Sequence, residues 1–513
     1  MKIIKIFRNT YVQIFLVFML ASLFRLTNIN LIEFKYDEAL SFYQTNLFFI
    51  DGTLPQKGIM ASTGMYNFPL FSYLLILIGL FSRNPLYMTF LIALINVGVI
   101  ILFYILIKRV FGTSVAFVSA ITLAVSPWAI IFSRKIWAQD LILFFAIPIF
   151  YFLIKSVENK KAYKLTLLSF LLFLLTQLHA SGAFLMTSII FIFILFKINF
   201  TKAKLIRGFI FASIFAFPYL IYQLSSLPFC RDCVAFLQYQ KADRIFDFIN
   251  FLRPFQILNG LDFQFLLGID YLDFQNYNIL IKPIGYIFLL EVFTFIISFL
   301  FYVKNNRSKI YLFLIFVIIP VLYFVSRTPG YMHYYVILLP LVAVSYALSF
   351  NYIYSIQKSN FFKASIVIIF LIFFLSKIIF ITAFFQYLNM KQSLSGDYGP
   401  AFLLTENLTS KQLEPYYGYK DYNEIKQFSY IFINTKIYHQ KMAELFLNLQ
   451  KPEFAILEYK QALQNNEQDL NSRINLAYLY IQLRKTSLAL DEIDIIEKQN
   501  ATVSAKLKGL IKE

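Results

Sequence analysis

Two apolar runs, "LYMTFLIALINVGVIILFYILI" (86–107) and "TSVAFVSAITLAVSPWAIIF" (113–132), are separated only by the basic pentapeptide "KRVFG" (108–112). Each run has the roughly 18 or more residues that a helix needs to cross about 30 Å of hydrocarbon. The connection between them is too short to hold a soluble domain. The stretch therefore predicts two neighbouring membrane spans that are joined by a basic loop.

The whole chain has the composition of a membrane protein. Of its 513 residues, 59% are hydrophobic, 19% aromatic and only 14% charged, unlike a soluble globular domain. Strands of a membrane barrel would be about ten residues long with alternating polarity, and that pattern is missing. We therefore predict an all-α polytopic bundle of about eleven transmembrane helices. The predicted spans are 11–26, 86–107, 113–132, 140–154, 165–180, 183–197, 205–222, 284–303, 310–325, 333–350 and 364–386.

The basic residues predict the orientation, because Lys and Arg collect in short cytoplasmic loops. With a cytoplasmic N-terminus, the inner loops "KRVFG", "KSVENKKAYK", "KINFTKAKLIR", "VKNNRSK" and "QKSNFFK" are all basic. The outer loops then include 27–85 and 223–283. The apolar run 68–81 is only about fourteen residues long, so we assign it to a helix on the membrane surface. As a span, it would place "KRVFG" outside.

The two ends of the chain complete this topology. The first eleven residues resemble the start of a signal peptide, but no small-residue cleavage site follows, so we interpret 11–26 as an uncleaved first span. An odd number of spans places everything after about residue 387 outside the plasma membrane. The net charge of +18 does not indicate nucleic-acid binding, because the basic residues are scattered between apolar runs. Membrane lipids are the expected partners.

We divide the chain into a membrane domain (1–386), a connecting segment (387–434) and helical repeats (435–513). The repeats have a period of 34, in which Ala443 matches Ala477 and Ala455 matches Ala489. Small residues at these offsets let paired helices pack closely, as in tetratricopeptide repeats. An amphipathic hairpin of no special family is the alternative. Two repeats and a helix need support from the preceding segment to fold.

Cys230 and Cys233, in "FCRDCV", are the two cysteines of the chain. Their number excludes a disulfide scaffold and a four-cysteine zinc site. A local disulfide and two free thiols fit the residues equally well. A thioredoxin-like redox motif fits less well, because the strand and helix that it needs are missing.

Adjacent acids follow the first span in "FKYDEALSFYQ", as Asp37 and Glu38. Acids near a membrane are usually kept for substrate, ion or structural pairing. Helix neighbours point about 100° apart, so these two acids cannot share one proton. One would instead remove a proton from an acceptor, and the other would hold a cation or a sugar hydroxyl. A solvated pair with Asp37 as a helix N-cap is the alternative.

Two further polar groups are expected on the same side of the membrane. In "SPWAIIFSRKIWAQD", Arg134 and Lys135 are phosphate-binding candidates, and Asp140 is either functional or a helix cap. In "SRTPGYMHYYVILLP", Arg327 and His333 add further candidates for phosphate binding, and Tyr335 adds an aromatic surface. His179, in "TQLHASG", is expected at the same level. Interfacial hydrogen bonding alone would explain either histidine, and their wide spacing does not indicate a metal site.

The order of these motifs resembles that of a known enzyme family. The stretches "RLTNINLIEFKYDEA", "FPLFSYLLILIGLF" followed by "KRVFG", "SPWAIIFSRKIWAQD" and "QLHASG" resemble polytopic glycosyltransferases of the GT-C class, family 39 type. That group includes the protein O-mannosyltransferases and the aminoarabinose transferases of lipid A. The resemblance covers residues 1–200 well, is weaker at "YMHYYVILLP", and does not include the repeats.

The resemblance implies a GT-C-like bundle that transfers a sugar from a polyprenyl-phosphate donor at the outer face, with inversion at the sugar carbon. The first-loop acid, Asp37, would be the base, with Glu38 beside it, and Asp140 would help to place a substrate. The acceptor would be a protein, a lipid or an envelope glycan. A single sugar is expected, because the Trp-Trp-Asp motif of oligosaccharyltransferases is missing. Neither a metal nor a cofactor is expected.

Two other classes of protein remain as alternatives. A lipid or sugar transporter, or a flippase, would also combine spans with buried charges, but no matching pair of broken segments occurs. The acids also cluster in outer loops rather than midway along spans. The second alternative is an inactive scaffold whose repeats recruit a protein partner.

Overall fold

The structure is a computed structural model that describes residues 9–512 except 35, 60, 62–64, 83, 226–245, 400, 404–438, 441, 442, 444, 445 and 448–451. Every element of regular secondary structure in this part of the chain is helical, which confirms the all-α prediction. The chain forms two compact units, Met1–Glu33 with Leu40–Tyr398, and Phe34–Ala39 with Gly399–Glu513. Cys230 and Cys233 lie outside the described residues.

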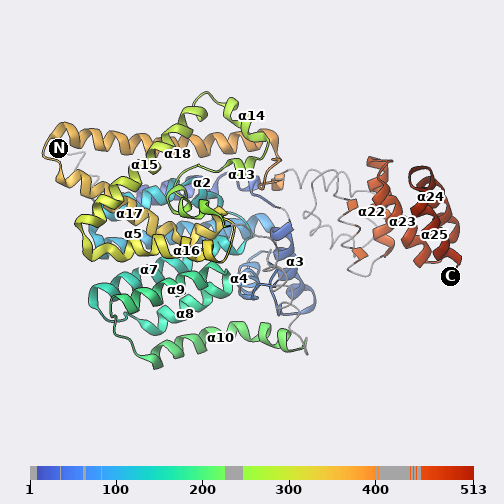
Figure 1. Ribbon diagram of the computed structural model, residues 1–513, viewed down its shortest axis with the longest axis horizontal. Helices are drawn as coiled ribbons and strands as arrows, with labels where there is room; N and C mark the ends of the chain where they lie inside the picture. Colours follow the sequence, from blue (N-terminus) through green and yellow to red (C-terminus); the bar gives the residue numbers. More distant parts are fainter. Residues whose placement is uncertain are drawn as a thin grey trace. The chain divides into compact units, whose positions relative to one another are not determined.

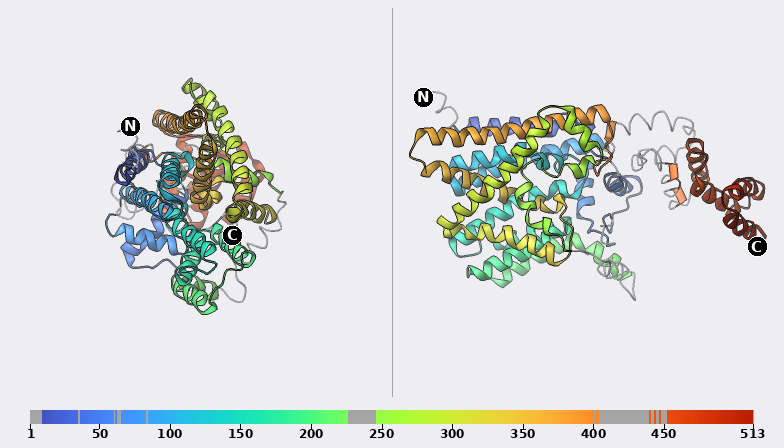
Figure 2. Two further views of the ribbon diagram at one scale, coloured as in Figure 1. Left: turned by 90° about the vertical axis from the view of Figure 1, so that its left-hand side faces the viewer. Right: turned by 45° about the horizontal axis from the view of Figure 1, so that its top comes forward.

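The first unit is a bundle of long apolar helices that lie side by side (Figures 1 and 2). Within the described residues, seven helices are long and apolar enough to cross a membrane, and further apolar helices are shorter. The helices at the predicted spans are α2 (Thr10–Leu26), α5 (Pro85–Val125), α7 (Ile142–Asn159), α8 (Leu165–Leu178), α9 (Ser181–Leu195), α10 (Lys202–Ser225), α15 (Ile281–Asn305), α16 (Ile310–Val325), α17 (Leu339–Ile356) and α18 (Asn360–Lys391).

Short helices connect these spans. They are η1 (Ile29–Leu31), α3 (Tyr36–Asp51), α4 (Leu70–Gly79), α6 (Pro127–Ile131), η2 (Ala138–Leu141), η3 (Phe248–Phe251), α12 (Arg253–Gln256), α13 (Gln264–Leu267), α14 (Asp270–Tyr277), η4 (Arg307–Lys309) and η5 (Met332–Leu338). At 1.5 Å per residue, the ten residues of α4 extend over only about 15 Å. The apolar run 68–81 therefore forms a helix that is too short to span a bilayer.

Helix α5 contains two of the predicted spans, because the chain reverses its direction at Gly112. Lys108 Nζ donates to Thr10 Oγ1 (2.7 Å), near the start of α2. The Tyr104 hydroxyl donates to Gln13 Oε1 (2.7 Å), so this part of α5 runs antiparallel to α2. Beyond Gly112 the carbonyl of Ala124 accepts from Arg25 Nη1 (2.8 Å), near the end of α2, so this part runs parallel to α2. Gly112 has φ 81° and ψ 175°, a conformation that is essentially restricted to glycine. Counting α5 twice, the described residues have apolar helices at all eleven predicted positions.

The loops that connect the helices of the first unit lie at two ends of the bundle, and contacts between them show which loops share an end. At one end, Lys309 pairs with Glu158 (3.4 Å) and lies over the ring of Phe111, and Lys161 forms a bridge with Asn199. We call this the basic end, because it brings together the predicted inner loops. The opposite end, here the site end, contains residues 27–33, 132–140, 179–181 and 326–335. The loops therefore separate as the charge pattern predicts.

The centre of the bundle is formed by α17, which packs against α5, α7 and α15 and is buried along most of its length. In contrast, α10, α15 and α18 expose large apolar side chains, among them Ile214, Phe293 and Ile368. Exposed apolar surface on this scale marks contact with lipid rather than with water. Lys377 and Glu291 form an ion pair between α18 and α15, with both side chains buried.

In the part of the second unit that the structure describes, four helices pack in sequence. They are α22 (Pro452–Asn465), α23 (Leu470–Gln482), α24 (Thr486–Gln499) and α25 (Ala501–Lys512). The alanines that match at a period of 34, Ala443 with Ala477 and Ala455 with Ala489, are all fully buried. Phe446 and Tyr480 lie in the same core. Small residues thus stand where neighbouring helices approach each other.

Candidate functional site

The loop between α6 and η2 is closed by one of its own acids. The backbone N–H of Lys135 donates to Asp140 Oδ2 (2.7 Å), and Asn96 Nδ2 donates to the carbonyl of Asp140 (2.8 Å). Asp140 is fully buried. In this structure the predicted second-loop acid therefore shapes the loop that carries Arg134 and Lys135, and it is not on the surface.

Lys135 reaches from this loop to the segment after η1. Its Nζ lies 2.7 Å from Glu33 Oε2, and both side chains are buried. The ammonium also lies 3.9 Å from the centre of the Trp137 ring, which is a favourable cation–π position. The ion pair joins residues that are about 100 positions apart in the sequence, and its ammonium supports one face of the Trp137 ring.

Arg134 is used for structure rather than presented at a surface. Its guanidinium donates to the carbonyls of Phe24 (2.7 Å) and Asn28 (2.5 Å) and lies over the ring of Phe385. Burial lowers the pKa of Arg134 to about 10, so this side chain stays charged at neutral pH. Arg25, which is also fully buried, lies near enough for the two guanidinium groups to repel each other.

The buried charged side chains around this loop carry a net positive charge as a group, and hence a positive field. The group has three cations and two carboxylates, so one positive charge is in excess. The cations are Arg25, Arg134 and Lys135, and the carboxylates are those of Glu33 and Asp140. The two arginines hydrogen bond to carbonyl oxygens, which do not neutralise their charge. In a medium of low dielectric constant such a field favours an anion at the adjoining surface.

Aromatic and imidazole rings form the accessible part of the site end. Trp137 and His333 meet edge to face with centroids 5.2 Å apart, and Tyr331 stacks on His333 at 5.7 Å. Tyr334 lies 4.2 Å from His333 and 5.9 Å from His179. All five rings are partly or well exposed. We call Trp137, His179, Tyr331, His333 and Tyr334 the ring cluster.

His179 follows α8 as its C-cap residue. Its Nδ1 accepts from the backbone N–H of Ser181 (3.2 Å) and lies 2.7 Å from Ser181 Oγ. Burial lowers its pKa to about 4, so the ring is neutral at pH 7. With Nδ1 acting as an acceptor, the neutral ring has its proton on Nε2. Nε2–H is then available as a donor within the ring cluster.

Residues 247–250, which follow α10 in the chain, brace the segment that carries His333. Asp247 accepts from the N–H of Gly330 (2.8 Å), and Asn250 Nδ2 donates to the carbonyl of Thr328 (3.0 Å). Tyr335 is fully buried, and its hydroxyl donates to Asn250 Oδ1 (2.6 Å). Tyr335 therefore lies inside this brace instead of lining a surface, unlike the neighbouring Tyr334.

Two other predicted groups are not members of the ring cluster. Arg327 is exposed and lies over the ring of Phe246, 4.9 Å from its centre. Asp37 and Glu38 are in the first turn of α3, where Asp37 is partly exposed and Glu38 is buried. This turn belongs to the second unit.

Glu33 and Asn96 belong to the site end but were not among the residues predicted from the sequence. Glu33 stands in "NLIEFK", an acid between apolar neighbours, and such an acid near a membrane indicates a specific partner. Asn96, a polar residue within an apolar span, gives the same signal. Within the described residues, no group of three or more His, Cys, Asp or Glu side chains is arranged to hold a metal ion.

Fold and site together define a polytopic all-α membrane protein with a positively charged, ring-lined site at one end of its bundle. No protein-family model and no curated protein matches this sequence. A solved structure of ArnT from Cupriavidus metallidurans, bound to undecaprenyl phosphate, is similar with a TM-score of 0.49 and 12% identity. The similarity covers 92% of this chain and 81% of that chain. At this level it says nothing about the activity of the present chain.

Proposed function

We propose that this chain is a membrane glycosyltransferase that moves a single sugar from a polyprenyl-phosphate donor to an acceptor at the outer face of the membrane. The observation that carries the proposal is the convergence of three separate loops on one end of the bundle. They contribute Lys135 with Trp137, His179, and His333 with Tyr334. The sequence resemblance to family 39 type enzymes points to the same reaction.

The donor phosphate would bind where the positive field and the ring donors coincide. The excess charge of Arg25, Arg134 and Lys135 favours a phosphate, and it would also favour the charge that develops on the phosphate as it leaves. The Nε2–H of the neutral His179 would donate a hydrogen bond without adding a charge. The sugar would lie against Trp137 and Tyr334, because aromatic faces pack well against the apolar face of a sugar ring.

In the proposed reaction an acceptor oxygen attacks the anomeric carbon of the sugar. A C–O bond forms, the bond from that carbon to the phosphate oxygen breaks, and the electron pair leaves with the polyprenyl phosphate. Asp37 would take the acceptor proton as general base, and Glu38 would stand beside it. Asp140 would act through the loop that it closes, as a positioning residue.

The assay uses the full chain in proteoliposomes with a labelled polyprenyl-phosphate sugar and an envelope extract as the acceptor. A positioned base contributes about 10²- to 10⁴-fold to a rate, so Asp37→Asn should reduce transfer by that order while the chain stays folded. Asp491→Asn, which changes an exposed acid of the same unit, is the matched control and should transfer normally. Unchanged transfer by Asp37→Asn would remove Asp37 as the base.

The same proteoliposomes separate the enzyme from the two alternatives. A flippase would move the labelled lipid between leaflets without forming a labelled product. An inactive scaffold would do neither. A labelled product that depends on Asp37 supports transfer, and its absence with every envelope fraction would contradict the proposal.

The helices of the second unit would hold the acceptor protein or a partner enzyme, because stacked helical pairs present an extended surface for peptides. A photo-crosslinking residue at the exposed Tyr478 of the full chain in its native membrane tests this. A specific protein adduct is expected. Recovery of lipid or of no adduct would contradict a role for these helices in protein recruitment.

A further inference from the structure

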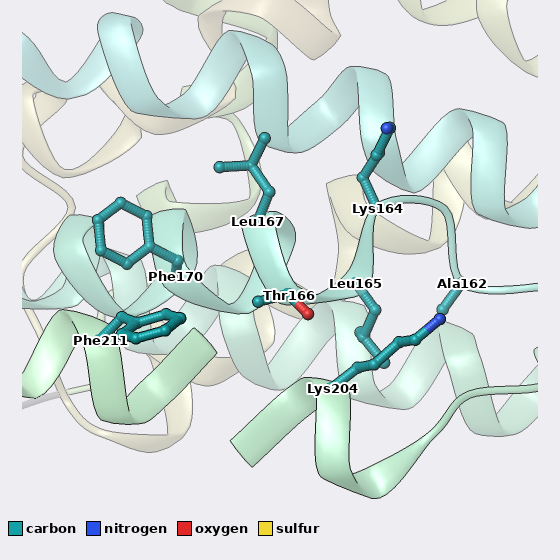
Figure 3. A pocket seen from close by; sticks show the side chains of 8 residues that line it. All are labelled: Ala162, Lys164, Leu165, Thr166, Leu167, Phe170, Lys204 and Phe211. Atoms are coloured by element: carbon teal, nitrogen blue, oxygen red, sulfur yellow. The ribbon is translucent and has the colours of Figure 1, made fainter. Parts of the chain in front are cut away.

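A groove at the basic end has no part in the proposed reaction. It runs between the first turns of α8 and α10 and is an open groove with a volume of about 660 Å³. Figure 3 shows Lys204 reaching toward Ala162, Lys164 projecting from the other edge, and the rings of Phe170 and Phe211 together at the far end. One end of the groove is thus cationic and the other aromatic.

The groove lies beside a close contact between the two helices. A Cβ atom added to Gly208 of α10 would clash with Ser169 Oγ and with the carbonyl oxygen of Thr166, both in α8. Small residues let membrane helices approach in this way. Lys204 and Phe211, four residues before and three after Gly208, share its face of the helix, so their side chains extend along the seam.

The charge around the cationic end is strongly positive. The loops before α8 and α10 are held together by the bridge between Lys161 and Asn199. They contribute the exposed Lys160, Lys161 and Lys202 in addition to the two lysines of the groove. Glu158, the acid of this region, pairs with Lys155 (3.1 Å) and Lys309 (3.4 Å). An anionic group is therefore the complementary occupant.

A free inorganic anion would not fit the whole groove, because it has no apolar part to fill the apolar end. Phe170 and Phe211 line it, and α10 also has exposed apolar side chains there, such as Ile210 and Ile214. An occupant that satisfies both ends has an anionic head and an apolar tail. Basic pockets between membrane helices bind lipid head groups by this combination.

We propose that this groove is a binding site for an anionic glycerophospholipid from the leaflet at the basic end. Its phosphate lies between Lys164 and Lys204, and one acyl chain follows Phe170 and Phe211 along α10. The site is separate from the ring cluster at the opposite end of the bundle. Its occupant is a structural lipid and not the sugar donor.

Native mass spectrometry of the detergent-solubilised full chain tests the site by titration with phosphatidylglycerol, phosphatidylcholine or undecaprenyl phosphate. The wild type should retain phosphatidylglycerol in preference to phosphatidylcholine. Two lysines near a head group contribute substantially to anionic lipid binding, so Lys164→Gln with Lys204→Gln should weaken phosphatidylglycerol binding by about tenfold or more. Phe211→Ala should weaken it while the preference for an anionic head remains.

The matched control is Lys304→Gln with Lys358→Gln, which removes two exposed lysines from the same end outside the groove and should leave binding unchanged. Three results would overturn the proposal. The control could lose as much binding as the groove variant, phosphatidylcholine could bind equally well, or undecaprenyl phosphate could displace phosphatidylglycerol at equal concentration. The last result would identify the groove as a donor site instead.

Discussion

Lys135 and Glu33 form a buried ion pair with 2.7 Å between Nζ and Oε2, and this pair connects the loop before α7 to the segment after α2. Trp137 covers the ammonium at 3.9 Å and in turn meets His333. The accessible rings of the site therefore rest on a buried electrostatic contact. We therefore expect substitutions in the ion pair to reduce stability, and substitutions in the rings to change sugar transfer.

Lys135→Met should destabilise the bundle strongly, because it leaves the Glu33 carboxylate buried without its ammonium. Removing one partner of a buried pair costs about 3–5 kcal/mol. The double variant Lys135→Met with Glu33→Leu should recover part of this loss. Thermal unfolding in detergent measures the effect. Lys155→Met, at an ion pair nearer the surface, is the control and should cost less than about 1 kcal/mol; equal losses in the two single variants would contradict the prediction.

Gly112→Ala should destabilise the reversal within α5. Nothing lies within 4 Å of an added Cβ at this position, so the cost comes from the backbone, which has φ 81° and ψ 175°. A non-glycine residue in such a conformation costs about 1–3 kcal/mol. Gly98→Ala in the same helix also has free space but helical dihedrals, and it should be neutral or slightly stabilising. Thermal unfolding measures both variants. If Gly98→Ala were less stable than Gly112→Ala, the proposed reversal at Gly112 would be contradicted.

Much of the fold could be predicted, because membrane spans depend on local composition. Runs of about 18 apolar residues are visible in the sequence, and "KRVFG" indicated the turn that Gly112 makes. The common location of Lys135, His179 and His333 could be predicted as well. Alternating spans place every second loop on one side of a bilayer, and the contacts between these rings and loops agree.

The roles of single side chains could not be predicted in the same way, because they depend on which atoms meet across the fold. Arg134 was a candidate for phosphate binding, but its donors reach the carbonyls of Phe24 and Asn28. Tyr334 and Tyr335 are neighbours, and only Tyr334 faces the ring cluster. A 3₁₀ turn rotates successive side chains by about 120°, which no local property of the sequence reveals.

Acidification should reduce the stability of the folded chain through His179. Burial lowers the pKa of this imidazole to about 4 in the folded state, against about 6.5 when it is exposed. Between these values the unfolded chain binds the proton first, so the stabilisation that is complete above pH 6.5 is lost as the pH falls toward 4. Thermal midpoints at pH 4.5, 5.5 and 7 measure this loss. His179→Gln should have a flatter profile, and parallel profiles would show that His179 is not the group concerned.

Trp137→Ala should reduce sugar transfer by about fivefold or more, because an aromatic anchor is worth on the order of 1 kcal/mol beyond its buried area, and because the substitution also uncovers the Lys135 ammonium. Trp137→Phe should keep most of the activity, since a ring remains at the same place. A stacking role predicts a rise in KM for the lipid-linked sugar at constant acceptor. A fall in kcat alone, with KM unchanged, would instead indicate that Trp137 acts on the chemical step.

The adjacent tyrosines provide the matched comparison for this test. Tyr334→Phe removes a hydroxyl from the ring cluster and should raise KM. Tyr335→Phe removes the buried hydrogen bond to Asn250, which should cost about 1 kcal/mol of stability and change KM little. If Tyr335→Phe raised KM as much as Tyr334→Phe, the surface that binds the sugar would have to include the brace around Asn250, and the ring cluster alone would not account for recognition. The expected separation of the two effects follows from the exposure of Tyr334 and the complete burial of Tyr335.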